Sequence, residues 1–152
     1  MEKKLRWYNL LTINSYWLGI NIATGIITPV LLPALVVLFM PPEQKNTNLA
    51  LVRMIGLAVA MLVQPLAGLF SDRSTHKLGR RRPYIFAGAI LNLVFLLVIG
   101  ASTLFYDPAS TGSPVTSSGF TTAFLVLILG VTLWQASTNI GHGALQGLIP
   151  DL

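Results

Sequence analysis

Residues 68–85 read GLFSDRSTHKLGRRRPYI and gather six charged side chains in one short stretch of an otherwise apolar chain. The whole chain of 152 residues is 53% hydrophobic and 10% charged, whereas soluble globular domains carry about 25% charged residues. The apolar runs on either side of this stretch are each long enough to cross a membrane as a helix, which takes roughly 20 apolar residues. We therefore expect the charged part of this stretch, residues 71–83, to form a loop between two membrane-spanning helices.

Four apolar runs predict an all-α membrane protein, with helices at about residues 8–40, 48–70, 83–106 and 119–147. Strands of a membrane barrel would be shorter and would alternate apolar and polar residues. The basic N-terminus is similar to the start of a signal peptide, but the apolar run behind it is too long and shows no clear small-residue cleavage site. We expect an uncleaved first helix. The sequence contains no cysteine, which excludes disulfides and thiolate metal sites.

Basic residues mark one side of the membrane. Residues 3–6 contain three and residues 71–83 contain five, whereas residues 41–48 contain one and residues 107–119 contain none. Because short cytoplasmic loops are enriched in Lys and Arg, we expect the N-terminus and residues 71–83 to be cytoplasmic, in a multi-pass protein of the plasma membrane. Since the positive charge flanks apolar spans, the expected partner is the lipid bilayer and not a nucleic acid.

Polar side chains inside the first and fourth runs follow the spacing of a helix. In the fourth run the intervals are four, three and four residues, which places the side chains on one stripe. They either hydrogen-bond to neighbouring helices, at about 0.6 kcal/mol each, or line a water-filled cavity and contact a polar solute, and four on one stripe favour the cavity. The candidate cavity residues are Asn14, Trp17, Asn21, Gln135, Asn139, His142 and Gln146. No second histidine lies at ligand spacing, so no metal site is predicted.

The charged loop also carries a family signature. The motif GLFSDR at residues 68–73, followed after a five-residue spacer by GRR at residues 79–81, resembles the signature loop of the major facilitator superfamily. The long spacer, the QP pair at residues 64–65 and the TP pair at residues 28–29 are similar to those of the sucrose–proton symporters and their glycoside–pentoside–hexuronide:cation relatives. This resemblance implies a secondary transporter of a sugar or glycoside that works by proton or sodium symport with alternating access. It implies neither an enzyme nor a cofactor.

The resemblance assigns a role to the loop. A facilitator consists of two six-helix halves, so residues 1–152 would be an incomplete N-terminal half, inactive without the missing C-terminal helices of the same transporter. Asp72 is implied to face the positive N-terminal end of a helix in that second half and to close a cytoplasmic gate. Arg80 or Arg81 can pair with Asp72 and with Asp151. The expected gating residues are Gly68, Asp72, Arg73, Gly79, Arg80, Arg81 and Asp151.

Several interpretations stay open at this point. No Asp or Glu lies within the four apolar runs, so a coupling proton would use His142 or a carboxylate outside them. Arg53 either extends to the lipid headgroups or faces a water-filled cavity. Pro29 and Pro33 are expected to bend or break the first helix. The alternative to a transporter is a non-transporting membrane scaffold or an anionic-lipid-binding module that uses residues 80–82.

Overall fold

The computed structural model describes residues 7–74, 81–106 and 121–148, and these segments are almost entirely helical. The elements are α1 (Trp7–Ile26), the π-helical turn η1 (Ile27–Leu31), α2 (Leu32–Phe39), α3 (Lys45–Arg73), α4 (Arg82–Ala101), the 3-10 turn η2 (Ser102–Phe105) and α5 (Thr122–Leu148). Four helical stretches in this part of the chain are long and apolar enough to cross a membrane. The prediction of an all-α membrane fold is confirmed. The cytoplasmic placement of the N-terminus stays a prediction.

The helix boundaries differ from the apolar runs: the run expected at residues 83–106 ends in the 3-10 turn η2, and α5 begins three residues later than expected. The run expected at residues 48–70 is part of α3, which is three residues longer at each end, because polar residues extend a helix beyond its membrane-crossing segment. The run expected at residues 8–40 is divided into α1, η1 and α2, and its widened π turn contains Pro29. Pro33, which lacks an amide hydrogen, follows in the first turn of α2.

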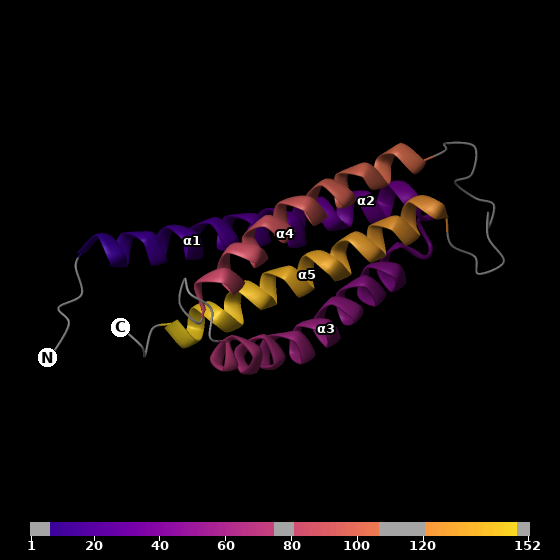
Figure 1. Cartoon of the computed structure of the whole chain (residues 1–152). Coiled ribbons are helices and arrows are strands. Elements are labelled where there is room, and N and C mark those ends of the chain that lie inside the picture. The colour runs from indigo at the N-terminus through magenta and orange to yellow at the C-terminus, as the bar shows by residue number, and fades with distance from the viewer. Residues whose placement is uncertain (1–6, 75–80, 107–120, 149–152) are drawn as a thin grey trace, which may run out of the picture.

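Helix α5 is the centre of the bundle. Figure 1 shows α5 between α4 and α3, with α1 and α2 running behind as one bent rod. Half of the membrane segment of α5 is buried, against 17% for α4 and 11% for α3. The outer faces of α3 and α4 therefore carry the large exposed apolar side chains, such as Met61 and Leu97, as expected for helices that face lipid or further helices.

Two glycine contacts let α5 approach both neighbours closely. A Cβ atom on Gly88 of α4 would lie 2.9 Å from the amide nitrogen of Gly141, so backbone meets backbone there. On the opposite side, a Cβ atom on Gly143 would lie 2.7 Å from the carbonyl oxygen of Gln64 in α3. Small residues at such crossings are how membrane helices gain close van der Waals contact.

An apolar core closes the end of the bundle at which α2 lies. Phe39 and Val36 of α2, Val52 of α3, Ile99 of α4 and Phe124 of α5 are each at most 1% exposed there. The opposite end contains the ends of α3 and α4 beside the charged loop. The bundle is thus apolar and tightly packed at one end, and the Asp72–Arg81 ion pair lies at the other.

Candidate functional site

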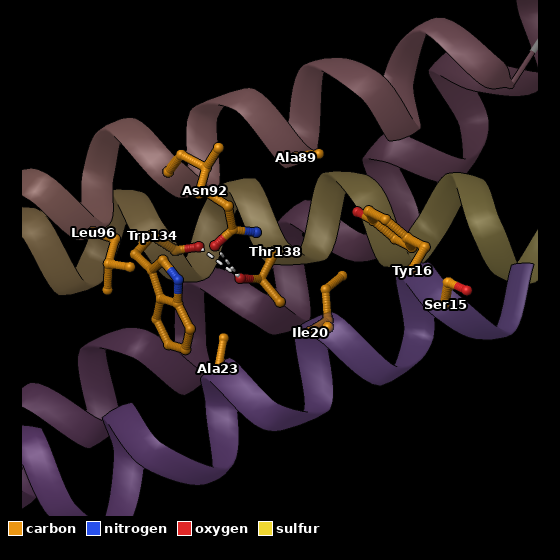
Figure 2. A pocket seen from close by; sticks show the side chains of 11 residues that line it. Ser15, Tyr16, Ile20, Ala23, Ala89, Asn92, Leu96, Trp134 and Thr138 are labelled. Atoms are coloured by element: carbon orange, nitrogen blue, oxygen red, sulfur yellow. Dashed lines mark hydrogen bonds between the residues drawn. The ribbon is translucent and has the colours of Figure 1, made fainter. Parts of the chain in front are cut away.

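A cavity of about 310 Å³ lies between α1, α4 and α5. Its wall is mostly apolar, with Ile20 of α1, Leu93 and Leu96 of α4, and Trp134 of α5 among the lining side chains. Pockets of this size, apolar with a few polar groups, are typical of sites for small molecules. Figure 2 shows that the side chains from the three helices converge on this space.

The polar groups of the cavity come from all three helices. The hydroxyl of Thr138 lies 3.1 Å from Oδ1 of Asn92 and 2.9 Å from the carbonyl oxygen of Trp134, and its single proton can be donated to one of them at a time. The hydroxyl of Tyr16 is buried and finds no hydrogen-bond partner among the described residues. It fills the space that a side chain on Gly141 would need. The polar side chains that line the cavity thus include the paired Thr138 and Asn92, and the Tyr16 phenol, whose oxygen lies against Gly141.

The residues selected from the sequence lie elsewhere. None of the seven candidate cavity residues lines this space. The Trp17 and His142 rings stack against each other, with centroids 4.6 Å apart and planes inclined by 36°. Nε2 of Gln64 donates to Oε1 of Gln146 at 3.0 Å, which joins α3 to α5. The neighbouring residues Tyr16 and Trp17 of α1 thus both contact α5, Tyr16 at Gly141 and Trp17 at His142. Of these two, Tyr16 lines the cavity and Trp17 does not.

Three more of the selected residues bond to their own helix or contact α3. Nδ2 of Asn21 donates to the carbonyl oxygen of Trp17, and Nδ2 of Asn139 donates to that of Gln135, so both amides bond to their own helix. The side chain of Gln135 lies beside Gly56 of α3. The remaining candidate, Asn14, is exposed on α1. We call the side chains of Trp17, Asn21, Gln64, His142 and Gln146 the α1–α3–α5 polar face. Contact of these residues with a solute stays a prediction.

Sequence reasoning missed the polar residues of the cavity. Asn92 is the one carboxamide between residues 83 and 106 of the third apolar run. A polar residue alone in such a run is costly unless it meets a partner, and this signal points to Asn92. Thr138 carries no comparable signal, because a hydroxyl can bond to its own helix. Tyr16 also carries no such signal, because a tyrosine is common in an apolar run.

An ion pair joins the end of α3 to the residue just before α4, and its arginine lies against α5. Nη2 of Arg81, just before α4, lies 2.5 Å from Oδ1 of Asp72 at the end of α3. The Arg81 side chain is 12% exposed, whereas that of Asp72 is 54% exposed. The guanidinium occupies the space above Gly147, where a side chain would collide with it. The structure pairs Asp72 with Arg81, whereas the other arginine that the sequence offered, Arg80, lies outside the described residues.

The other gating candidates are placed only in part. Gly68 lies on α3 beside Gly143, and Arg73 is the exposed last residue of α3. Gly79, Arg80 and Asp151 lie outside the described residues. Within residues 7–74, 81–106 and 121–148, no three His, Cys, Asp or Glu side chains are grouped so that they could hold a metal ion.

Comparison with known proteins gives the family. No family model matches the chain, and no solved structure matches it. The rice (Oryza sativa subsp. japonica) sucrose transport protein SUT1 is 39% identical over 100 residues, which cover 64% of this chain and 19% of that protein. The Arabidopsis thaliana sucrose transport protein SUC3 is 33% identical over 101 residues, or 64% of this chain and 17% of that protein.

A third relative extends the aligned part. The sucrose transport protein SUT5 of Oryza sativa subsp. indica is 30% identical over 112 residues, which cover 71% of this chain and 21% of that protein. The chain thus spans about a fifth of the length of the curated relatives it matches. The printed names of these relatives agree with the family that the charged loop motif of this chain resembles. The chain belongs to the sucrose-transporter branch of the major facilitator superfamily.

Proposed function

We propose that this chain supplies the first four membrane helices of a secondary transporter that carries a sugar or glycoside, coupled to a cation, by alternating access. The observation that carries the proposal is the 39% identity to a sucrose transport protein over 64% of the chain. A proton is the favoured coupling ion and sodium is the second candidate. The four apolar runs expected from the sequence include no Asp or Glu. The coupling carboxylate is therefore expected in helices beyond these four.

The α1–α3–α5 polar face is the better candidate for sugar contact. Sugars present hydroxyl groups, and the amides of Gln64 and Gln146 can both donate and accept hydrogen bonds. The ring of Trp17 lies on the same face, stacked on His142, and offers an apolar surface to a pyranose. In transporters of this architecture the site lies between two halves. We therefore propose that this face forms one wall of the site and that further helices of the same transporter form the other.

The ion pair beside the loop is proposed to belong to the cytoplasmic gate. The carboxylate of Asp72 is half exposed although it pairs with Arg81, so one side of it is available to a further partner. A helix N-terminus carries a partial positive charge that stabilises a carboxylate. In the proposed gate, Arg81 fixes the direction of Asp72, and Asp72 contacts the second half while the outside is open.

Sugar uptake tests this proposal. Cells that express a complete transporter containing these residues should take up labelled sucrose or a glucoside, faster at an acidic external pH, and a protonophore should abolish the uptake. Asp72→Asn should slow uptake and shift the reactivity of cysteines introduced on the two faces toward thiol labels, whereas Arg82→Gln, which neutralises the exposed arginine at the start of α4, should change neither.

Four outcomes count against parts of the proposal. No uptake of any sugar at any pH, with the protein present in the membrane, removes the transport function. Uptake that follows sodium and ignores the protonophore changes the coupling ion. Unchanged uptake and labelling in Asp72→Asn removes the gate, and a dependence on anionic lipid that is lost with residues 80–82 favours the lipid-binding alternative. Purified residues 1–152 alone are expected to show no uptake in proteoliposomes.

A further inference from the structure

Arg53 makes a contact that neither interpretation of the sequence anticipated. It lies on α3, eight residues after Lys45, within a segment that is long and apolar enough to cross a membrane. A lysine or arginine near the end of such a helix usually extends to the headgroups. Here Nη2 of Arg53 instead donates to the backbone carbonyl oxygen of Thr28, at 3.1 Å, on the neighbouring bent helix. The guanidinium therefore binds a backbone acceptor that lies 25 positions earlier in the chain.

The carbonyl of Thr28 is available because its own helix has no donor for it. In an α-helix the amide of Leu32 would bind it, but this amide donates to the carbonyl of Ile27 in the π turn. In a continued π pattern the next donor would be residue 33, and Pro33 has no amide hydrogen. Both intrahelical donors are therefore excluded, one by the π turn and the other by the proline.

Thr28 lies within the segment Asn14–Phe39, which is long and apolar enough to cross a membrane. An acceptor without a partner is expensive in such a segment, because hydrocarbon offers it no hydrogen bond. Arginine suits the position, because its planar guanidinium has five N–H groups and stays charged. We propose that Arg53 is a positioning residue that supplies the hydrogen bond withheld by Pro33, and that it thereby fixes the π turn between α1 and α2 onto α3. This inference concerns the chain's own backbone and holds whether or not the proposed sugar transport is correct.

The proposal predicts that Arg53 and Pro33 are energetically coupled. In the purified full chain in detergent, Arg53→Met should lower the midpoint of thermal unfolding by about 5 °C, as expected for loss of one hydrogen bond to a charged group in a chain of this size. In the Pro33→Ala background the restored amide can bind the Thr28 carbonyl, so the same change should cost much less. Arg53→Lys should retain part of the effect, and Lys45→Met, an exposed cation on the same helix, should change little.

A spectroscopic measurement reports the hydrogen bond directly. Thr28-Pro29 is the one Thr-Pro pair in the sequence, so labelling threonine with ¹³C at the carbonyl and proline with ¹⁵N singles out the Thr28 carbonyl by NMR. Its resonance should move upfield in Arg53→Met and much less in Arg53→Met with Pro33→Ala. An unchanged resonance in Arg53→Met, or equal thermal losses with and without Pro33, would overturn the proposal. If Arg53→Met does not fold, the comparison of Arg53→Lys with and without Pro33 gives the same test.

Discussion

Helix α5 contacts α4 on one side and α3 on the other through the same kinds of contact, but the polar contact is shielded on the α4 side and exposed on the α3 side. Toward α4, glycine meets glycine at positions 88 and 141, and the polar contact between Thr138 and Asn92 is largely shielded beside the cavity. Toward α3, Gly143 meets the backbone of Gln64, but the amide pair of Gln64 and Gln146 is exposed. Each side thus combines one close backbone contact with one polar contact between side chains, and they differ in what surrounds the polar contact.

This difference separates packing from binding. A shielded polar pair contributes to helix association because its alternative is an unpaired group in an apolar environment. An exposed pair loses little when it opens, so its donors and acceptors are available to a ligand. The α4 side is therefore expected to set the stability of the four helices, and the α3 side to carry the sugar contact proposed above.

The largest effect is expected from filling the glycine contact toward α4. Gly88→Ala places a methyl group within 3.0 Å of the Gly141 backbone and of the Ser137 carbonyl oxygen, so the helices must separate, at about 1–3 kcal/mol. Gly100→Ala on the same helix meets nothing within 4 Å and should be neutral or slightly stabilising. Thermal unfolding of the two purified variants measures the difference. Equal midpoints for both would show that the α4–α5 crossing is not tightly packed.

The sequence predicted the membrane-spanning helices better than it predicted which helix faces contact one another. Hydropathy sums over many residues, so the four helices follow from composition alone, and proline correctly indicated the bend in the first. The spacing of the polar residues places them on one stripe because α5 is a helix, but periodicity does not say which neighbouring helix that stripe contacts. Thr138 is adjacent to Asn139 in sequence and reaches the cavity because one residue turns a helix by about 100°. The contact of Arg53 with Thr28 depends on tertiary packing and leaves no local signal.

A middle-sized effect is expected from the shielded polar pair. Thr138→Val removes the hydroxyl and leaves Oδ1 of Asn92 without its partner beside the apolar cavity, which should cost about 1 kcal/mol. Replacing both residues, by Thr138→Val with Asn92→Leu, should cost no more than the single change, because no polar group is then left unpaired. Unfolding of the single and double variants completes the thermodynamic cycle. Strictly additive losses would mean that the two side chains act independently.

The smallest effect on stability is expected from the exposed amide pair, and it is also the sharpest test of the comparison. Gln146→Leu should cost about 0.6 kcal/mol or less, since Gln64 can turn to other partners when its bond to Gln146 is lost. In the complete transporter the same change should lower sugar uptake about tenfold at subsaturating sugar, which corresponds to about 1.4 kcal/mol of lost binding. Thr138→Val should show the opposite pattern, with lower stability and nearly normal uptake per folded molecule. If Gln146→Leu reduces stability and uptake in the same proportion, the α3 side is a packing surface like the α4 side, and the sugar contact must be sought in the cavity beside Tyr16.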